Sequence, residues 1–124
     1  MKEETRKLLD KSAHAIRAAR VLLENGEADF AAGLAYYAMF YAAEALLWEQ
    51  GRRSGTHSGV HSLFGERFAK QGPLDPKYHR WMLDAFGRRI QGDYGFDAGL
   101  APEDAARTIG QASEFLSATG VLRF

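Results

Sequence analysis

The stretch from Ala28 to Trp48, ADFAAGLAYYAMFYAAEALLW, constrains the fold more than any other part of the chain. Asp29 and Glu44 are its only charged residues, and its apolar side chains fall on every side of a helix rather than along one stripe. A helix that is apolar all round is a buried helix. Its uncharged run is too short to cross a bilayer, which needs roughly 20 apolar residues. We therefore expect the core helix of a small soluble bundle.

Length and composition indicate one intracellular domain. The chain of 124 residues, 46% of them hydrophobic, is long enough to bury a substantial core, so residues 1–124 are expected to form a single domain. It has no cysteine, which excludes disulfides and thiolate metal sites. The N-terminal sequence MKEETRKLLDKSAHA is charged and lacks the apolar core of a signal peptide. We expect a cytoplasmic protein that does not associate with membranes.

Charge is unevenly distributed although the formal net charge is zero. Residues 50–92 carry eight Lys or Arg against three Asp or Glu, together with three of the four histidines, His57, His61 and His79. An anionic partner would meet the protein in this middle third. A solvated basic face is the alternative interpretation.

Apolar periodicity and capping signals predict an all-α protein with four to five helices. The helices are expected over residues 5–25, 28–50, 58–70, 76–92 and 102–119, with a glycine-rich loop over 92–100. Asp29 is the expected N-cap of the second helix, Thr56 or Ser58 that of the third, and Asp75 that of the fourth. Short connections between neighbouring helices indicate an up-and-down arrangement.

Three segments carry a resemblance to a known family. In chain order they are AYYAMFYAAEALLWEQG, THSGVHSLFGERFAKQGPLDP and RRIQGDYGF. Together they resemble the small single-domain branch of the HEPN superfamily over roughly residues 5–118. The resemblance implies a helical bundle that pairs into a homodimer. It also implies action beside a minimal nucleotidyltransferase in a two-gene toxin–antitoxin system, and many members are metal-independent ribonucleases.

The resemblance also points to a site. HEPN ribonucleases use an arginine, a polar residue beside it and a histidine four to six positions on. The corresponding stretch here runs from Arg88 through Arg89 to Asp93 and Tyr94, with Asp93 where the histidine is expected. Arg89 could hold a phosphate with support from Arg88, whereas an ionised Asp93 would repel it. An Arg89–Asp93 pair that locks the helix end is the structural alternative.

Tyr94 is a further candidate by resemblance alone. In some HEPN proteins the partner enzyme nucleotidylates a tyrosine just after the histidine, and Tyr94 is the nearest match, with its offset different by one. The candidate catalytic residues are therefore Arg89, Asp93 and Tyr94.

A second cationic segment lies between the second and third helices. Arg52, Arg53 and His57 flank a loop of small residues that leads into a helix, and such a loop can bind phosphate or the RNA backbone. The Arg52-x4-His57 spacing matches the family motif literally, but it lies at a different place in the chain.

His57 and His61 have the i, i+4 spacing of two metal ligands. No third ligand completes that site, so we expect helix capping or packing, with no metal and no cofactor. The aromatics Tyr36, Tyr37, Phe40 and Tyr41 could stack on bases, but we expect two or three of them in the core and the rest at a dimer surface.

The sequence thus predicts a homodimeric HEPN protein that acts with a nucleotidyltransferase and binds RNA or nucleotides at the Arg89–Tyr94 segment. One alternative is a non-catalytic dimeric scaffold. Another is a ribonuclease, which requires that the fold bring His57, His61 or His79 beside Arg89.

Overall fold

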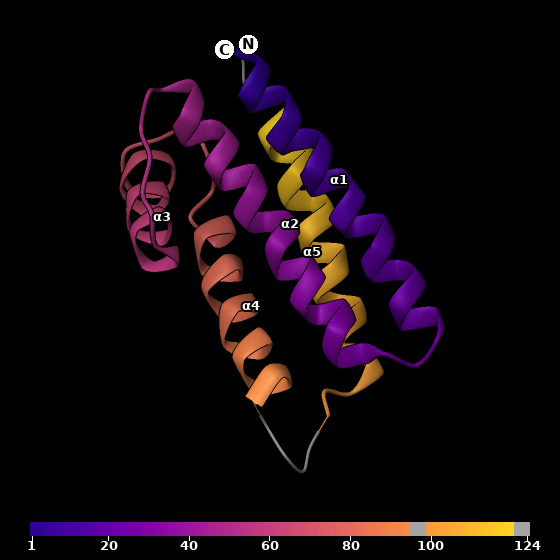
Figure 1. Ribbon diagram of the computed structural model, residues 1–124. Helices are drawn as coiled ribbons and strands as arrows, with labels where there is room; N and C mark the ends of the chain where they lie inside the picture. The colour runs from indigo at the N-terminus through magenta and orange to yellow at the C-terminus, as the bar shows by residue number, and fades with distance from the viewer. Residues whose placement is uncertain (95–98, 121–124) are drawn as a thin grey trace.

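The computed structural model is a bundle of five α-helices (Figure 1). It describes residues 1–94 and 99–120, and the side chains within these ranges except those of 91–94. The described residues contain no strand, which confirms the all-α prediction. The helices are α1 (Glu3–Glu24), α2 (Ala28–Glu49), α3 (His57–Phe64), α4 (Lys77–Tyr94) and α5 (Pro102–Gly120), and α3 continues as a π-helical segment (Gly65–Lys70).

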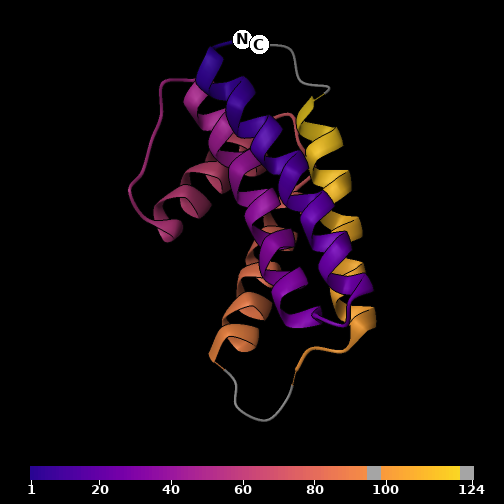
Figure 2. The same ribbon diagram turned by 45° about the vertical axis from the view of Figure 1, so that its right-hand side comes forward.

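Helix α2 is the centre of the bundle. It packs against α1, α4 and α5, and α3 reaches it from the remaining side (Figures 1 and 2). Its buried side chains therefore face in every direction, as its sequence predicts. Among the described helices α2 alone is long and apolar enough to cross a membrane. In its most apolar window 67% of the residues are buried inside the fold, which equally fits a core helix.

Small side chains let α1 and α2 approach each other closely. Ala19 of α1 and Ala35 of α2 are fully buried, and Ser12 donates a 2.6 Å hydrogen bond to the backbone carbonyl of Ala38. Buried polar groups need such partners because an unpaired one costs free energy. The alanine-rich sequence of α2 thus fixes the distance between the two longest helices.

Two of the expected helix caps are confirmed. The Thr56 side chain accepts a 3.0 Å hydrogen bond from the backbone N–H of Gly59, and Asp75 accepts one of 2.9 Å from that of Lys77. The expected cap at Asp29 is wrong: Glu27 is the N-cap residue of α2, and Asp29 lies within the first turn. There its carboxylate accepts a 2.6 Å hydrogen bond from the backbone N–H of Leu100.

The expected end of the fourth helix at Gly92 is also wrong, because α4 continues to Tyr94. One glycine costs a helix only about 1 kcal/mol relative to alanine, which the packing of a long helix can offset. On the interior face of α4, Met82 and Ala85 are fully buried and Arg89 is partly buried.

Candidate functional site

A buried hydrogen-bond cluster joins α2 to α3. The hydroxyl of Tyr36 lies 2.6 Å from Nδ1 of His57 and 2.7 Å from Nε2 of His61. Tyr36 is fully buried and His61 is 6% exposed, whereas His57 is partly exposed. The i, i+4 spacing of the two histidines turns both rings toward one face of α3, so a single phenol can contact both.

Aromatic rings enclose this cluster. Phe40 stacks on the His57 ring with the centroids 4.5 Å apart, and Phe86 of α4 stacks on it at 5.8 Å. Phe86 also meets His61 edge to face at 5.1 Å. The cluster is therefore built by three helices and lies in a largely apolar setting.

Burial keeps the three titratable groups uncharged near neutral pH. It raises the pKa of the Tyr36 phenol well above its ordinary range. Burial lowers the pKa of His57, and the positive charge of Arg89 lowers it further. Burial, with the nearby His57 and His79, lowers the pKa of His61 to about 4. Both imidazoles are therefore neutral at pH 7.

Arg89 lies next to this cluster. Its guanidinium carbon is 5.1 Å from the centre of the Tyr37 ring, and the Tyr37 ring in turn contacts His57, with centroids 5.9 Å apart. The aliphatic part of Arg89 crosses α2 at Gly33, where a Cβ would be 3.8 Å from Cγ of Arg89. Tyr37 therefore lies between the cation and the buried histidine cluster.

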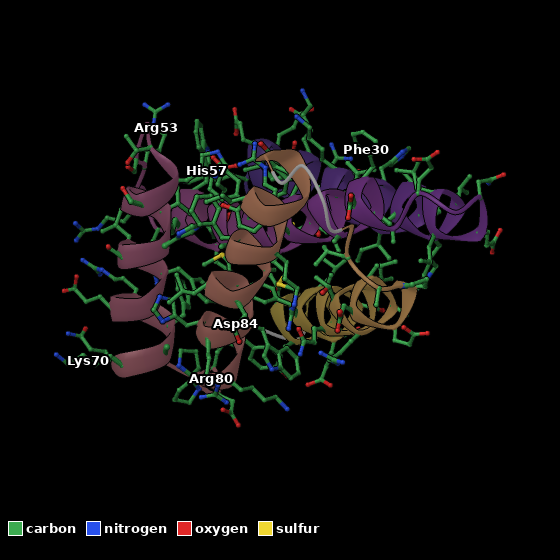
Figure 3. The ribbon with its side chains drawn as sticks, turned by 90° about the horizontal axis from the view of Figure 1, so that it is seen from below. Phe30, Arg53, His57, Lys70, Arg80 and Asp84 are labelled. Carbon is green, nitrogen blue, oxygen red and sulfur yellow. The ribbon has the colours of Figure 1, made fainter. Side chains whose placement is uncertain are left out.

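An open groove of about 380 Å³ begins at Arg89. Its walls come from α1, α2 and α4, and its lining residues are Leu22, Phe30, Gly33, Leu34, Tyr37 and Arg89. Phe30 is 63% exposed, an unusual position for a large aromatic side chain. Figure 3 shows Arg53, His57 and Phe30 along one edge of the molecule, with Arg80 on the opposite edge.

The other predicted anion-binding residues are divided between two places. Arg88 points to α5, where its Nη1 donates a 3.1 Å hydrogen bond to Thr108. Arg52 and Arg53 line a separate cavity of about 120 Å³, and the Arg53 guanidinium lies 4.5 Å from the Trp48 ring centre. Their roles in binding RNA stay predictions, and of the predicted anion-binding residues Arg89 is the one that lines the groove with Phe30 and Tyr37.

Two predicted site residues fall outside what the structure describes. The side chains of Asp93 and Tyr94 belong to the undescribed range 91–94, although the backbone of both is helical. The Arg89–Asp93 pair and the modification of Tyr94 therefore stay predictions. Arg89 does have a further interaction within the fold beyond its contact with Tyr37.

Sequence reasoning missed the role of Tyr36, which it treated as one aromatic among four. The available signal was the i, i+4 histidine pair, which needs a polar partner when it faces a core helix. Of the four aromatics, Tyr36 and Phe40 are buried, within the predicted two or three. The described residues contain no group of three His, Cys, Asp or Glu side chains placed to hold a metal ion.

Comparison with known proteins agrees with this architecture. The model of the HEPN domain matches residues 5–122. The UPF0332 protein glr0978 of Gloeobacter violaceus is 38% identical over 117 residues, which cover 94% of this chain and 93% of that protein. A Methanocaldococcus jannaschii protein named "Putative toxin MJ0605" is 31% identical over 116 residues, which cover 94% of this chain and 86% of its own length. A UPF0332 protein of Thermotoga maritima is 34% identical over 100 residues, 81% of this chain and 76% of that protein. The chain therefore belongs to the HEPN domain family.

Proposed function

We propose that this HEPN protein is the RNA-binding member of a two-gene toxin–antitoxin pair, with a minimal nucleotidyltransferase as its protein partner. The toxin name of the M. jannaschii relative, which aligns over 94% of this chain, supports the class of system. Membership in the HEPN domain family supports a nucleotidyltransferase as the protein partner. The residues that line the groove support RNA as the ligand.

The position of Arg89 carries the proposal. A guanidinium at the rim of an open groove presents several N–H donors in a geometry that fits a phosphate. The Tyr37 ring beneath it and the exposed Phe30 farther along the groove offer faces on which unpaired bases can stack. This combination of cation and aromatic faces is typical of sites for single-stranded RNA.

We also propose that the protein works as a homodimer whose interface lies beside the groove of Phe30 and Arg89. Among the exposed large apolar side chains are Phe30, which lines the groove, and Val21 and Ile90, which are 57% and 41% exposed and directly adjoin the lining residues Leu22 and Arg89 in sequence. A second copy related by a two-fold axis would cover these side chains and bring two copies of Arg89 to one cleft. Gel filtration with light scattering at tens of micromolar protein tests this, and a monomer would contradict the shared cleft.

RNA binding can be tested with a matched pair of variants on α4. Arg89→Ala removes the groove cation, whereas Arg80→Ala removes an exposed cation on the opposite edge (Figure 3). We expect Arg89→Ala to weaken binding of a fluorescent single-stranded RNA at least about tenfold, because a charge-assisted hydrogen bond contributes roughly 1.5–3 kcal/mol. Arg80→Ala should change the dissociation constant less than about twofold.

Wild-type protein that binds no RNA at tens of micromolar would contradict the RNA-binding part and favour the alternative of a non-catalytic dimeric scaffold. An equal loss in both variants would show that binding reflects general charge rather than the groove. The partner is tested separately, by co-expression with the protein encoded by the neighbouring gene. A neighbour that is not a nucleotidyltransferase would remove that part of the proposal.

A further inference from the structure

A partly exposed stripe of α2 leads away from the groove. Its members share one face of the helix, because they are four, three and four positions apart; they are Tyr37, Tyr41, Glu44 and Trp48. Each of the three rings has a cation over it: Arg89 over Tyr37, Lys11 over Tyr41 and Arg53 over Trp48. The stripe thus joins the groove, which Tyr37 lines, to the cavity of about 120 Å³, which Glu44 and Trp48 line.

This cavity is apolar inside and cationic toward solvent. Leu47 of α2 and Val60 of α3 line it and are each 1% exposed, so they form its inner wall beside the Trp48 ring. Arg52 and Arg53, from the loop between the two helices, are exposed and form its rim. An apolar cavity of about 150 Å³ takes up benzene, so this one, which is open at the rim, has room for one ring of a planar ligand.

Glu44 is the one lining residue whose polar group has no evident role in the fold. Its side chain is partly buried, and within the described part of the chain it has no hydrogen bond and no ion pair. The ammonium of Lys11 lies 4.6 Å from the centre of the Tyr41 ring instead of pairing with it. Burial raises the pKa of Glu44, and Lys11 opposes that rise. A carboxylate that has lost water without gaining a donor favours a ligand that brings N–H groups to it.

Guanine has the edge that fits such a carboxylate. Its N1–H and 2-amino group are adjacent donors, so each can reach one of the two carboxylate oxygens. Adenine and cytosine pair a donor with an acceptor on the same edge, and uracil has its one N–H between two carbonyl oxygens. Each of these three bases would bring a lone pair against the carboxylate. The apolar inner wall suits the face of the ring, and guanidinium groups at the rim suit a phosphate.

We propose that this cavity is a guanine-binding site, in which the carboxylate of Glu44 accepts hydrogen bonds from N1–H and the 2-amino group. Arg52 and Arg53 contact the phosphate that adjoins the base. The guanosine phosphate is the same whether it is a free nucleotide or part of an RNA strand that runs from Arg89 along the stripe, a distance of about 16 Å from Tyr37 to Trp48. Only the RNA source rests on the proposed function.

The first test compares free nucleotides by isothermal titration calorimetry. The wild type should bind GMP at least about tenfold more tightly than AMP, because a bidentate contact to a base contributes about that much discrimination. IMP keeps N1–H but lacks the 2-amino group, so its affinity should fall between the two. Glu44→Gln offers one donor and one acceptor in place of two acceptors, so its preference for GMP should fall below about twofold. Glu103→Gln removes an exposed carboxylate in the first turn of α5 and should bind like the wild type.

The second test identifies the source of the base with two single-stranded RNAs, a short oligoadenylate and the same strand with guanine at alternate positions. Tighter binding of the guanine strand by the wild type, with the oligoadenylate bound equally by wild type and Glu44→Gln, identifies RNA as the source. The equal binding of oligoadenylate also shows that the variant is folded.

The outcomes of these tests separate the two proposals. A preference for GMP without any RNA binding contradicts the proposed function, while the guanine site stands and takes a free nucleotide. RNA bound without regard to its bases, together with equal affinities for GMP and AMP, overturns the guanine site while the proposed function stands. Binding of neither RNA nor GMP overturns both. A Glu44→Gln protein that keeps the wild-type preference overturns the role of Glu44.

The third test locates the site by fluorescence. The chain has two tryptophans, Trp48 and Trp81, so Trp81→Phe leaves the cavity tryptophan as the only one. GMP should quench the fluorescence of this variant. Adding Glu44→Gln to it should raise the GMP concentration needed for half of the quenching at least about tenfold. GMP that binds without changing the fluorescence of Trp48 would overturn this cavity as the site.

Discussion

The carboxylate of Asp29 accepts a 2.6 Å hydrogen bond from the backbone N–H of Leu100, 71 positions further along the chain. The bond ties the first turn of α2 to the segment that leads into α5. It also places a negative charge near the positive end of the α2 dipole. One side chain thus stabilises the helix that carries it and fixes the chain before the last helix.

Asp29→Ala should lower the free energy of unfolding by about 1.5–3 kcal/mol, because it removes a hydrogen bond to a charged acceptor. Urea unfolding measures this loss, and hydrogen exchange should show faster exchange of the Leu100 amide. Asp10→Ala is the control, since Asp10 is exposed on α1. Equal losses in the two variants would show that the Asp29 bond contributes nothing.

Stability should depend on pH through His61. Its pKa is about 4 in the folded protein and near 6.5 in an unfolded chain. Between these values the unfolded chain binds a proton that the folded protein does not, so the free energy of unfolding falls as pH falls. The stability is complete above about pH 6.5, and about 3 kcal/mol of it is lost by pH 4.

The measurement is urea unfolding of wild type and His61→Asn between pH 7 and pH 4.5. Other groups titrate in this range, so the difference between the two proteins is the quantity of interest. We expect the stability advantage of the wild type over the variant to shrink steadily as pH falls. An advantage that stays constant across the range would contradict the low pKa of His61.

The helices were predictable from the sequence because their signals are local. The all-round apolar composition identified α2 as the core helix, and the Thr56 and Asp75 caps lie within three residues of the N–H groups they bond. Helix ends that depend on packing were less predictable. Gly92 is a local stop signal, yet α4 continues through it.

The candidate site was predictable only in part, since its contacts join distant segments. The Arg89 and His57 candidates were visible as single residues, but Tyr36 lies 21 and 25 positions from its two histidine partners. No periodicity or spacing rule links residues across a helix–helix interface before the packing is known. The partner of Asp29 was unpredictable for the same reason.

Because α1 and α2 pack closely, a larger side chain between them should lower the free energy of unfolding. Ala19 is fully buried and lies two turns after Ser12, which bonds to α2, on the same face of α1, whereas its neighbour Ala18 is exposed. Ala19→Leu should cost about 1–3 kcal/mol through overpacking, and Ala18→Leu should change stability by less than about 0.5 kcal/mol. Thermal and urea unfolding of the two variants check this. Because leucine and alanine are both good helix formers, equal stabilities would mean that α1 and α2 can separate without cost.

Two glycines should respond to alanine in opposite directions. A Cβ at Gly72 would clash with the backbone oxygen of Arg67 and lie 2.5 Å from Cα of Phe68, and neither atom can rotate away. Gly72→Ala should therefore cost about 2 kcal/mol or more, since the end of the π-helical segment must move. A Cβ at Gly110, in α5, meets nothing within 4 Å. Gly110→Ala should raise the free energy of unfolding by up to about 1 kcal/mol, because alanine favours the helix and restricts the unfolded chain. Urea unfolding under identical conditions gives both values, and a change of the same sign in the two variants would contradict the close approach at Gly72.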